Sequence, residues 1–319
     1  MGDMNSDHLI PSATRHDPRV VLDAWEALRA AHPHVHGPEA AAMLGVPEAA
    51  LVASKVGQGA TVGLRPSLRA ALSSCAAWGK SLVALRNEAG VMLNVLDEVT
   101  LADAGAGLVK LVGRAHELLL ADTAIASLFL LEDNDSHGHT LSLNWFDAGG
   151  DVIGRVFLMS KAGRERALPE IVSLALAQQS RTLEFDPAAA RPDLLRLAPR
   201  TEPRASSQPR PAPARFAADA ILALADLPSV SVTMEGRGGA GHYLGAVTRT
   251  SQTGPAVHAT SSEIKLHLRP AAFVAACLST SEGGDPCARL VDGQGGALTL
   301  SAPRVPGSSW DALIAKELP

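Results

Sequence analysis

The chain of 319 residues is long enough for two domains of ordinary size, and 46% hydrophobic with 19% charged residues is a globular composition. A net charge of −5, 3% aromatic residues and no run of Lys or Arg argue against a nucleic-acid-binding surface. Three cysteines without CxxC spacing predict free thiols. No apolar stretch approaches the roughly 18 residues that span a bilayer, and no secretory signal is recognisable, so we expect a cytoplasmic protein without membrane insertion.

Helical patterning dominates the first 80 residues. Apolar side chains at helical spacing, from Val21 to Leu28, predict an amphipathic helix over residues 18–31 with Asp17 as its N-cap. The loop at residues 32–37 carries three histidines at alternate positions but no acidic or thiol partner, so we interpret it as a solvated loop rather than a metal site. Further helices are expected over residues 38–44, 47–54 and 67–77.

A run of strands follows these helices. Residues 142–158 carry the strongest hairpin signal, because apolar positions of period 2 flank the turn Phe-Asp-Ala-Gly-Gly-Asp at residues 146–151. A helix over residues 167–179 is expected to close this half of the chain. The other β-rich or apolar segments before the hairpin lie at residues 81–85, 90–95, 107–112 and 124–131.

A proline-rich stretch separates the two halves of the chain. Residues 186–213 have many prolines and little apolar periodicity, which is typical of a linker. A terminal apolar segment lies around Trp310. Between them we expect a helix at residues 216–227 and strands at residues 230–234, 243–247, 263–268 and 273–278.

A fainter copy of the hairpin lies near the end of the chain. Residues 290–298 repeat the order of apolar pair, aspartate, glycine-rich turn and apolar resumption, and Asp292 lies 292 − 147 = 145 positions after Asp147. This separation, nearly half the chain, indicates a duplication. Helices precede strands in each half instead of alternating with them. The sequence therefore predicts an α+β fold of two tandem structural repeats, each a largely antiparallel β-sheet flanked by helices.

The duplication also sets the expected domain boundaries. We assign the first repeat to residues 15–185, the proline-rich linker to residues 186–213, and a shortened second repeat to residues 214–319.

Several motifs together resemble one protein family. Arg86-Asn87-Glu88, the segment Ser142 to Asp151, Leu266-His267-Leu268-Arg269 and the Asp292 hairpin leading to Arg304 and Trp310 stand in the order and approximate spacing of the HemS-type haemin-degrading factors. Residues 30–33 and 43–51 also resemble the N-terminal helices of that family. The resemblance extends from about residue 25 to residue 318.

This resemblance implies a bacterial protein of haem utilisation that binds haem in a cleft between sheet and helices. Such a role requires an axial ligand for the iron and cationic or hydrogen-bonding groups for the propionates. The chain departs from the family in three places. Met92 stands where the family has a histidine, no histidine occurs between His139 and His242, where the principal ligand is expected, and Leu278 stands where a lysine is expected.

Three residues are candidates for the iron ligand. His242, next to a glycine-rich stretch, is either a substitute histidine ligand or part of a tight turn between strands. Met92 is either a thioether ligand or a core side chain. His267 alternates with leucines and is either a ligand or the partner of a cross-strand hydrogen bond. The resemblance implies Arg269, Arg86 and Arg304 as propionate partners.

Two functions stay open at this point. The first is a cytoplasmic haem-binding protein of haem and iron acquisition, acting as a haem carrier or as a haem-degrading factor with an oxygenase-like activity, with a haem oxygenase or a haem ABC importer as further partners. The second is a degenerate, non-catalytic relative that keeps the scaffold, no longer binds haem and acts as an interaction module. The sequence assigns no catalytic residue and no metal site besides haem iron.

Overall fold

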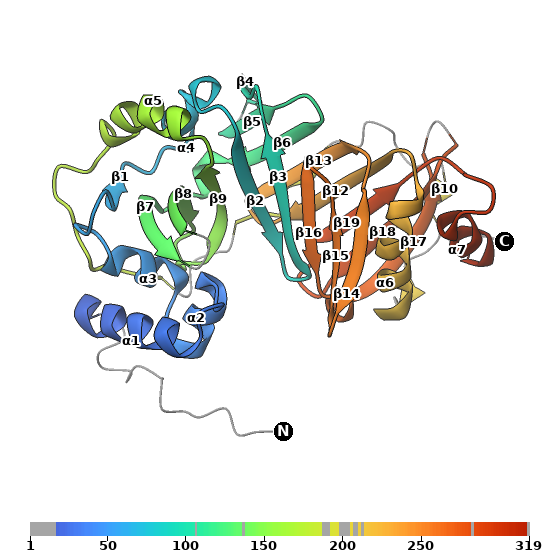
Figure 1. Cartoon of the computed structure of the whole chain (residues 1–319), viewed down its shortest axis with the longest axis horizontal. Helices are drawn as coiled ribbons and strands as arrows, with labels where there is room; N and C mark the ends of the chain where they lie inside the picture. The colour runs from blue at the N-terminus through green and yellow to red at the C-terminus, as the bar shows by residue number, and fades with distance from the viewer. Residues whose placement is uncertain are drawn as a thin grey trace. The chain divides into compact units, whose positions relative to one another are not determined.

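The chain forms two compact units, each assembled from two separate segments (Figure 1). A computed structural model describes residues 17–105, 107–135, 138–186, 192–197, 205–206, 210–211, 214–281 and 284–317. Unit 1 consists of residues 1–81 and 122–192, and unit 2 of residues 82–121 and 193–319. Among the described helices, none has the length and apolar composition needed to cross a bilayer.

Unit 1 begins with the predicted amphipathic helix. Helix α1, Pro18–Ala31, starts where the Asp17 side chain accepts the N–H of Arg19 at 2.9 Å, and it buries Trp25 and Leu28. A proline at the first helical position has no N–H that needs a partner, which favours this start. The other helices of the unit are α2 (Gly37–Leu44), α3 (Glu48–Ser54), α4 (Leu68–Leu72), α5 (Lys161–Val172) and the short 3-10 helices η3 (Cys75–Ala77) and η4 (Asp122–Ala124).

The strands of unit 1 are antiparallel and lie in the order β1-β7-β8-β9. Phe129 and Phe146 lie on one face, and they pack against Val52 of α3 in a hydrophobic cluster. Trp145, on the other face of β8, is completely buried. The strand bounds are β1 (Val62–Leu64), β7 (Ser127–Asp135), β8 (Gly138–Phe146) and β9 (Val152–Leu158).

Unit 2 contains two layers of strands. In one layer the order is β2-β3-β16-β15-β14, and in the other it is β10-β17-β18-β19-β12-β13-β6-β5-β4, with β11 paired to β17. The strand bounds are β2 (Ser81–Asn87), β3 (Gly90–Leu96), β4 (Thr100–Asp103), β5 (Leu108–Val112), β6 (His116–Ala121), β10 (Ala205–Ser206), β11 (Arg210–Pro211), β12 (Val230–Gly236), β13 (Gly239–Gly245), β14 (Arg249–Thr253), β15 (Ala256–Thr260), β16 (Ile264–Leu268), β17 (Phe273–Thr280), β18 (Pro286–Asp292) and β19 (Ala297–Ser301).

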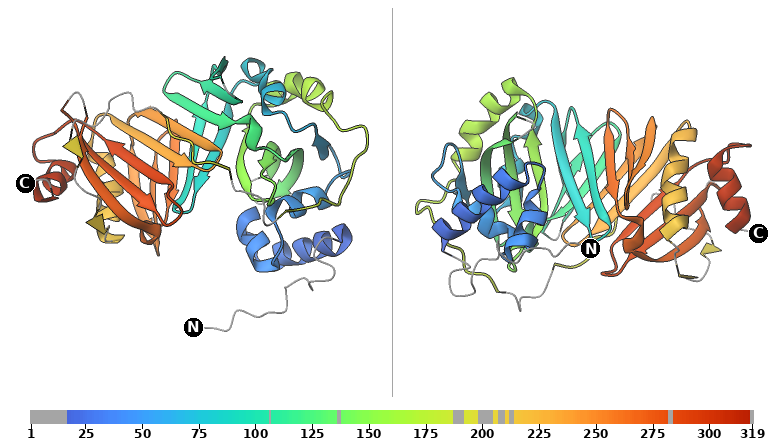
Figure 2. Two further views of the ribbon diagram at one scale, coloured as in Figure 1. Left: turned by 180° about the vertical axis from the view of Figure 1, so that it is seen from behind. Right: turned by 60° about the horizontal axis from the view of Figure 1, so that its bottom comes forward.

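The core of unit 2 joins both layers to its helices. Leu266 of β16, Tyr243 of β13 and Leu290 of β18 are completely buried in one hydrophobic cluster. Ile221 of α6 and Trp310 of α7 belong to the same cluster, and Figure 2 shows both helices beside the strands of this unit. The helices are α6 (Ala214–Leu222), α7 (Ser309–Glu317) and the 3-10 helices η5 (Ala223–Asp226) and η6 (Pro270–Ala272).

The two predicted hairpins have the same turn geometry. The Asp147 N–H donates to the carbonyl oxygen four residues later at 3.0 Å, and the Asp147 carboxylate accepts the N–H of that residue at 2.9 Å. Asp292 makes the same two hydrogen bonds at 2.8 Å and 2.8 Å. Gly150 and Gly295 occupy the same position with φ of +83° and +85°, which glycine adopts without steric cost. The repeated sequence pattern therefore corresponds to a repeated structure.

Some elements differ from the sequence expectations. The helix expected over residues 167–179 is α5, which ends at Val172, because the chain then turns and Ala175 forms an isolated bridge with Leu64. Strand β14 was not expected, since its residues, Arg-Thr-Ser-Gln-Thr, have almost no apolar signal.

The compact units also follow different boundaries from the predicted repeats. Residues 82–121 belong to unit 2 because β3 pairs with β16 and β6 pairs with β13. Much of the predicted linker, residues 186–213, lies outside the described residues, and β10 and β11 lie within it.

Candidate functional site on the ten-stranded sheet

A line of polar side chains crosses the ten-stranded sheet of unit 2. Antiparallel register places one residue of each strand opposite one residue of the next. Along β18 and β13, the neighbours of the line, such as Leu290 and Tyr243, point into the core, so the line faces out of it. We call this line the polar row, and it consists of Cys277, Arg289, Thr299, Thr233, His242 and Glu117, from six successive strands.

Arg289 is the central cation of the polar row. Its Nη2 lies 2.5 Å from Oε2 of Glu235, and its Nη1 donates to Oγ1 of Thr299 at 3.3 Å. The Glu235 side chain is only 7% exposed, whereas that of Arg289 is 30% exposed. A carboxylate buried to this extent needs a paired cation, so Glu235 holds the guanidinium at the sheet and neutralises its charge.

His242 is the imidazole of the polar row. It is half-buried on β13, and its Nε2 lies 3.0 Å from Oγ of Ser231 on the neighbouring strand. On its other side the register places Glu117 of β6, which forms an ion pair of 2.7 Å with Lys110. The row thus combines an imidazole, a guanidinium, a carboxylate and two threonine hydroxyls.

A second histidine lies in the core of unit 2, close to the row. His116 is 6% exposed, its Nδ1 lies 3.2 Å from Oδ1 of Asn94, and its ring stacks at a tilt on Tyr243 with centroids 5.0 Å apart. Burial lowers the pKa of His116 to about 4, although the charge of Glu263 acts to raise it. The imidazole is therefore neutral near pH 7 and acts as a core residue.

Of the six site residues predicted from the sequence, only His242 lies in the polar row. Met92 is completely buried in the core cluster, opposite Leu266 of β16. His267 lies opposite Val91, so its side chain leaves the other face of the same strands, and its Nδ1 contacts Nδ1 of His258 at 2.7 Å. A cross-strand contact of this kind was one of the two predicted roles for His267.

The three predicted arginines are also dispersed. Arg269 donates from Nη2 to the carbonyl oxygen of Glu88 at 2.9 Å. Arg304 forms an exposed ion pair of 3.2 Å with Asp311. Arg86 is exposed at the end of β2. None of these guanidinium groups belongs to the polar row.

Sequence reasoning missed Arg289 and Glu235. Arg289 lies three residues before Asp292, which is the place that Asn144 occupies before Asp147 in the first hairpin. Comparing the two copies position by position would have identified it. Glu235 follows the apolar alternation of β12, and a single acidic residue at the end of a strand carries no distinctive signal.

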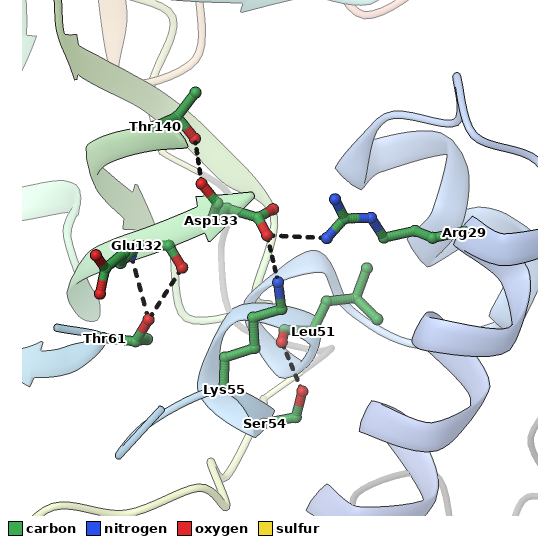
Figure 3. Close-up of polar contacts among 8 residues, drawn as sticks. All are labelled: Arg29, Leu51, Ser54, Lys55, Thr61, Glu132, Asp133 and Thr140. Atoms are coloured by element: carbon green, nitrogen blue, oxygen red, sulfur yellow. Dashed lines mark hydrogen bonds and ion pairs between the residues drawn. The ribbon is translucent and has the colours of Figure 1, made fainter. Parts of the chain in front are cut away.

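Unit 1 contains a separate cluster of charges, shown in Figure 3. Asp133 Oδ1 on β7 contacts Nη1 of Arg29 at 2.9 Å and Nζ of Lys55 at 2.6 Å, so it connects α1 and the end of α3 to the sheet. The Lys55 ammonium also lies 4.4 Å from the centre of the Trp25 ring. Burial acts to raise the pKa of Asp133, but the hydrogen bonds and charges of the two cations outweigh it and lower the pKa. These contacts indicate a structural role.

Known proteins resemble this chain in sequence pattern and in fold. Residues 45–173 match the family model of the haemin-degrading HemS.ChuX domain. The structure is similar to that of holo-PhuS, a heme-binding protein from Pseudomonas aeruginosa, with 22% identity and a TM-score of 0.77 over 93% of this chain and 98% of that chain. It is also similar to the heme degrading enzyme ChuS from Escherichia coli O157:H7, with 18% identity and a TM-score of 0.75 over 94% of this chain and 99% of that chain.

A second ChuS structure, described as an E. coli heme oxygenase, has 17% identity and a TM-score of 0.71 over 96% of this chain and 100% of that chain. A comparison with curated proteins found no match. Likeness over nearly the whole chain, together with the two matching hairpins, confirms the predicted α+β fold of two tandem repeats.

Proposed function

We propose that this chain, a HemS-type protein by the domain at residues 45–173, is a cytoplasmic haem carrier of haem utilisation. The single observation that supports this most directly is the position of His242. It is a half-buried imidazole in a polar row that also contains a guanidinium and hydroxyl groups. An axial imidazole and donors for the propionates are what haem requires.

The chemistry and spacing of the row fit this ligand. His242 would contact the iron, and the hydroxyls of Thr233 and Thr299 with the Arg289 guanidinium would receive the propionates. Neighbouring strands lie about 4.8 Å apart, so the backbones of His242 and Arg289, three strands apart, are separated by roughly 14 Å. The long Arg289 side chain shortens this span.

Binding requires two exchanges of partner in the polar row. His242 Nε2 contacts Ser231, and Arg289 contacts Glu235, so iron and propionate would compete with these groups. Bound haem would supply an iron centre with a site for a further ligand. Glu117, the acidic neighbour of His242, is held by Lys110 and is not poised for proton transfer, which favours binding and release over opening of the macrocycle.

The Arg289 to Glu235 ion pair also supports a second candidate function. A buried carboxylate beside the central cation disfavours a dianionic ligand. In this alternative the chain is a non-catalytic relative that keeps the scaffold and acts as an interaction module.

Titration of haem into the purified protein tests both candidates. For a carrier we expect a sharpened, shifted Soret band that saturates at one haem per chain. His242→Ala should shift the band and weaken binding at least tenfold, whereas Met92→Leu and His267→Gln should leave the spectrum unchanged. Featureless absorption of free haem at all ratios would establish the second candidate and sink the first.

A charge-neutral substitution separates the two candidates further. Glu235→Gln removes the carboxylate that competes with propionates while keeping a hydrogen-bond acceptor for Arg289. We expect haem affinity to rise several-fold in this variant, and Arg289→Ala to lower it. If neither substitution changes the affinity, haem binds somewhere other than the polar row.

Adding ascorbate to the haem complex tests the carrier role. A carrier should keep its Soret band and transfer haem to an acceptor such as apo-myoglobin. Decay of the band with a biliverdin-like product would instead identify a haem-degrading enzyme.

A further inference from the structure

Two histidines face each other on the outer side of a different layer of unit 2. His258 of β15 and His267 of β16 are directly opposite in the antiparallel register. Their Nδ1 atoms lie 2.7 Å apart, and their rings meet edge to face with centroids 4.9 Å apart. Both side chains are half-buried, and the adjacent residues Leu266 and Leu268 point into the core. The pair is therefore held by two rigid strands and is open to solvent on one side.

The short contact between the two Nδ1 atoms requires one shared proton. One ring donates Nδ1–H, and the other accepts it with its lone pair. Loss of this proton would direct two lone pairs into the same space, which is the arrangement of two ligands on one metal ion. Nitrogens bound to one ion at about 2.05 Å with an angle of 90° to 109° lie about 2.9 to 3.3 Å apart. The present distance needs to open by only about 0.2 to 0.6 Å, within the broad χ2 freedom of an imidazole.

We propose that His258 and His267 form a binding site for a late first-row divalent cation, of the Zn²⁺, Cu²⁺ and Ni²⁺ class that imidazole favours. The site is separate from the polar row and does not depend on haem binding. Among the described residues, no group of three or more His, Cys, Asp or Glu side chains is placed to hold a metal. The remaining coordination positions would therefore be filled by water or by a small chelating anion.

The charges around the pair favour an anionic co-ligand. Lys265 and Arg269 lie two residues before and after His267 on the same outer face, and both are exposed. Arg249, opposite Thr260 on the edge strand, adds a third cation. These groups repel a bare divalent cation but attract a metal that carries a negatively charged chelate.

The complex of Cu²⁺ with nitrilotriacetate is a suitable probe, since it leaves two adjacent coordination positions and carries a net negative charge. We expect one saturable site per chain, and an electron paramagnetic resonance spectrum with hyperfine coupling to two imidazole nitrogens. His258→Gln and His267→Gln should each weaken binding at least tenfold and leave one coupled nitrogen at most. His139→Gln, at an exposed histidine of unit 1, is the matched control and should bind as the unaltered chain does.

The unaltered protein provides a readout that does not depend on how the variants fold. Coupling to two imidazole nitrogens supports the proposal, whereas coupling to one or none overturns it. Equal affinity for the unaltered chain and for either glutamine variant, with circular dichroism confirming that the variant is folded, also overturns it.

Discussion

The buried His116 should make the stability of the protein depend on pH in a way that one substitution removes. Its folded pKa is about 4, because burial disfavours the imidazolium, whereas an unfolded chain has the ordinary value of about 6.5. Between these two values the unfolded state binds a proton that the folded state does not bind. Stability is therefore complete above pH 6.5 and is lost progressively as the pH falls toward 4.

The size of this loss follows from the two pKa values. A difference of roughly 2.5 units at about 1.4 kcal/mol per unit gives about 3 kcal/mol. The His116 side chain is 6% exposed and no hydrogen-bond partner reaches its Nε2, so the charged form gains little from solvent or neighbours. His116→Gln does not titrate in this range, and its amide can still reach Asn94.

Urea unfolding at pH 7.5 and pH 4.5 measures the effect in both proteins. We expect the free energy of unfolding to fall by about 2 to 3 kcal/mol more in the unaltered chain than in His116→Gln. Subtracting the two pH dependences removes the contribution of every other titrating group. Equal pH dependence, or an imidazole of His116 that titrates above pH 6 by NMR, would refute the reasoning.

Three further predictions concern stability. Asp292→Ala should cost about 3 kcal/mol in urea unfolding, because the 2% exposed carboxylate accepts three backbone N–H groups that would lose their partner; a loss below 1 kcal/mol would contradict this. Gly163→Ala normally stabilises a helix by about 1 kcal/mol. Here it should lower the melting temperature, since the new Cβ would lie 1.6 Å from the carbonyl oxygen of Trp78. Asp133→Asn should destabilise the protein by about 1 to 2 kcal/mol at pH 7 by weakening the contact with Lys55. The lowered pKa of Asp133 means that this difference should shrink below pH 3.8, and a constant difference would exclude the ion pair as its cause.

The parts of the fold that local pattern specifies were predictable from the sequence. The helix at residues 18–31 follows from apolar spacing and a cap, and the two hairpins follow from turn chemistry that only a few residue types provide. Met92 in the core agrees with the apolar alternation of its strand. Strand pairing between distant segments leaves no local trace, so the membership of residues 82–121 in unit 2 could not be derived in this way.

The candidate site was predictable only in part for the same reason. His242 could be identified from its residue type, but Arg289 becomes its neighbour through the register of four strands. Likewise, nothing in the sequence around His267 indicates that His258 lies opposite it, because the two are joined by a turn whose register is fixed by the fold.

The division of unit 2 into two chain segments has a consequence for synthesis on the ribosome. His116 on β6 pairs with Tyr243 on β13, and the two are 243 − 116 = 127 residues apart. At roughly 5–20 residues per second, β6 waits on the order of 6–25 s for its partner to be made. During that interval Leu118 and Leu120, both completely buried in the finished protein, have no core to enter. The nascent chain should therefore depend on chaperones that shield apolar strands, and slower growth at low temperature should raise its soluble yield.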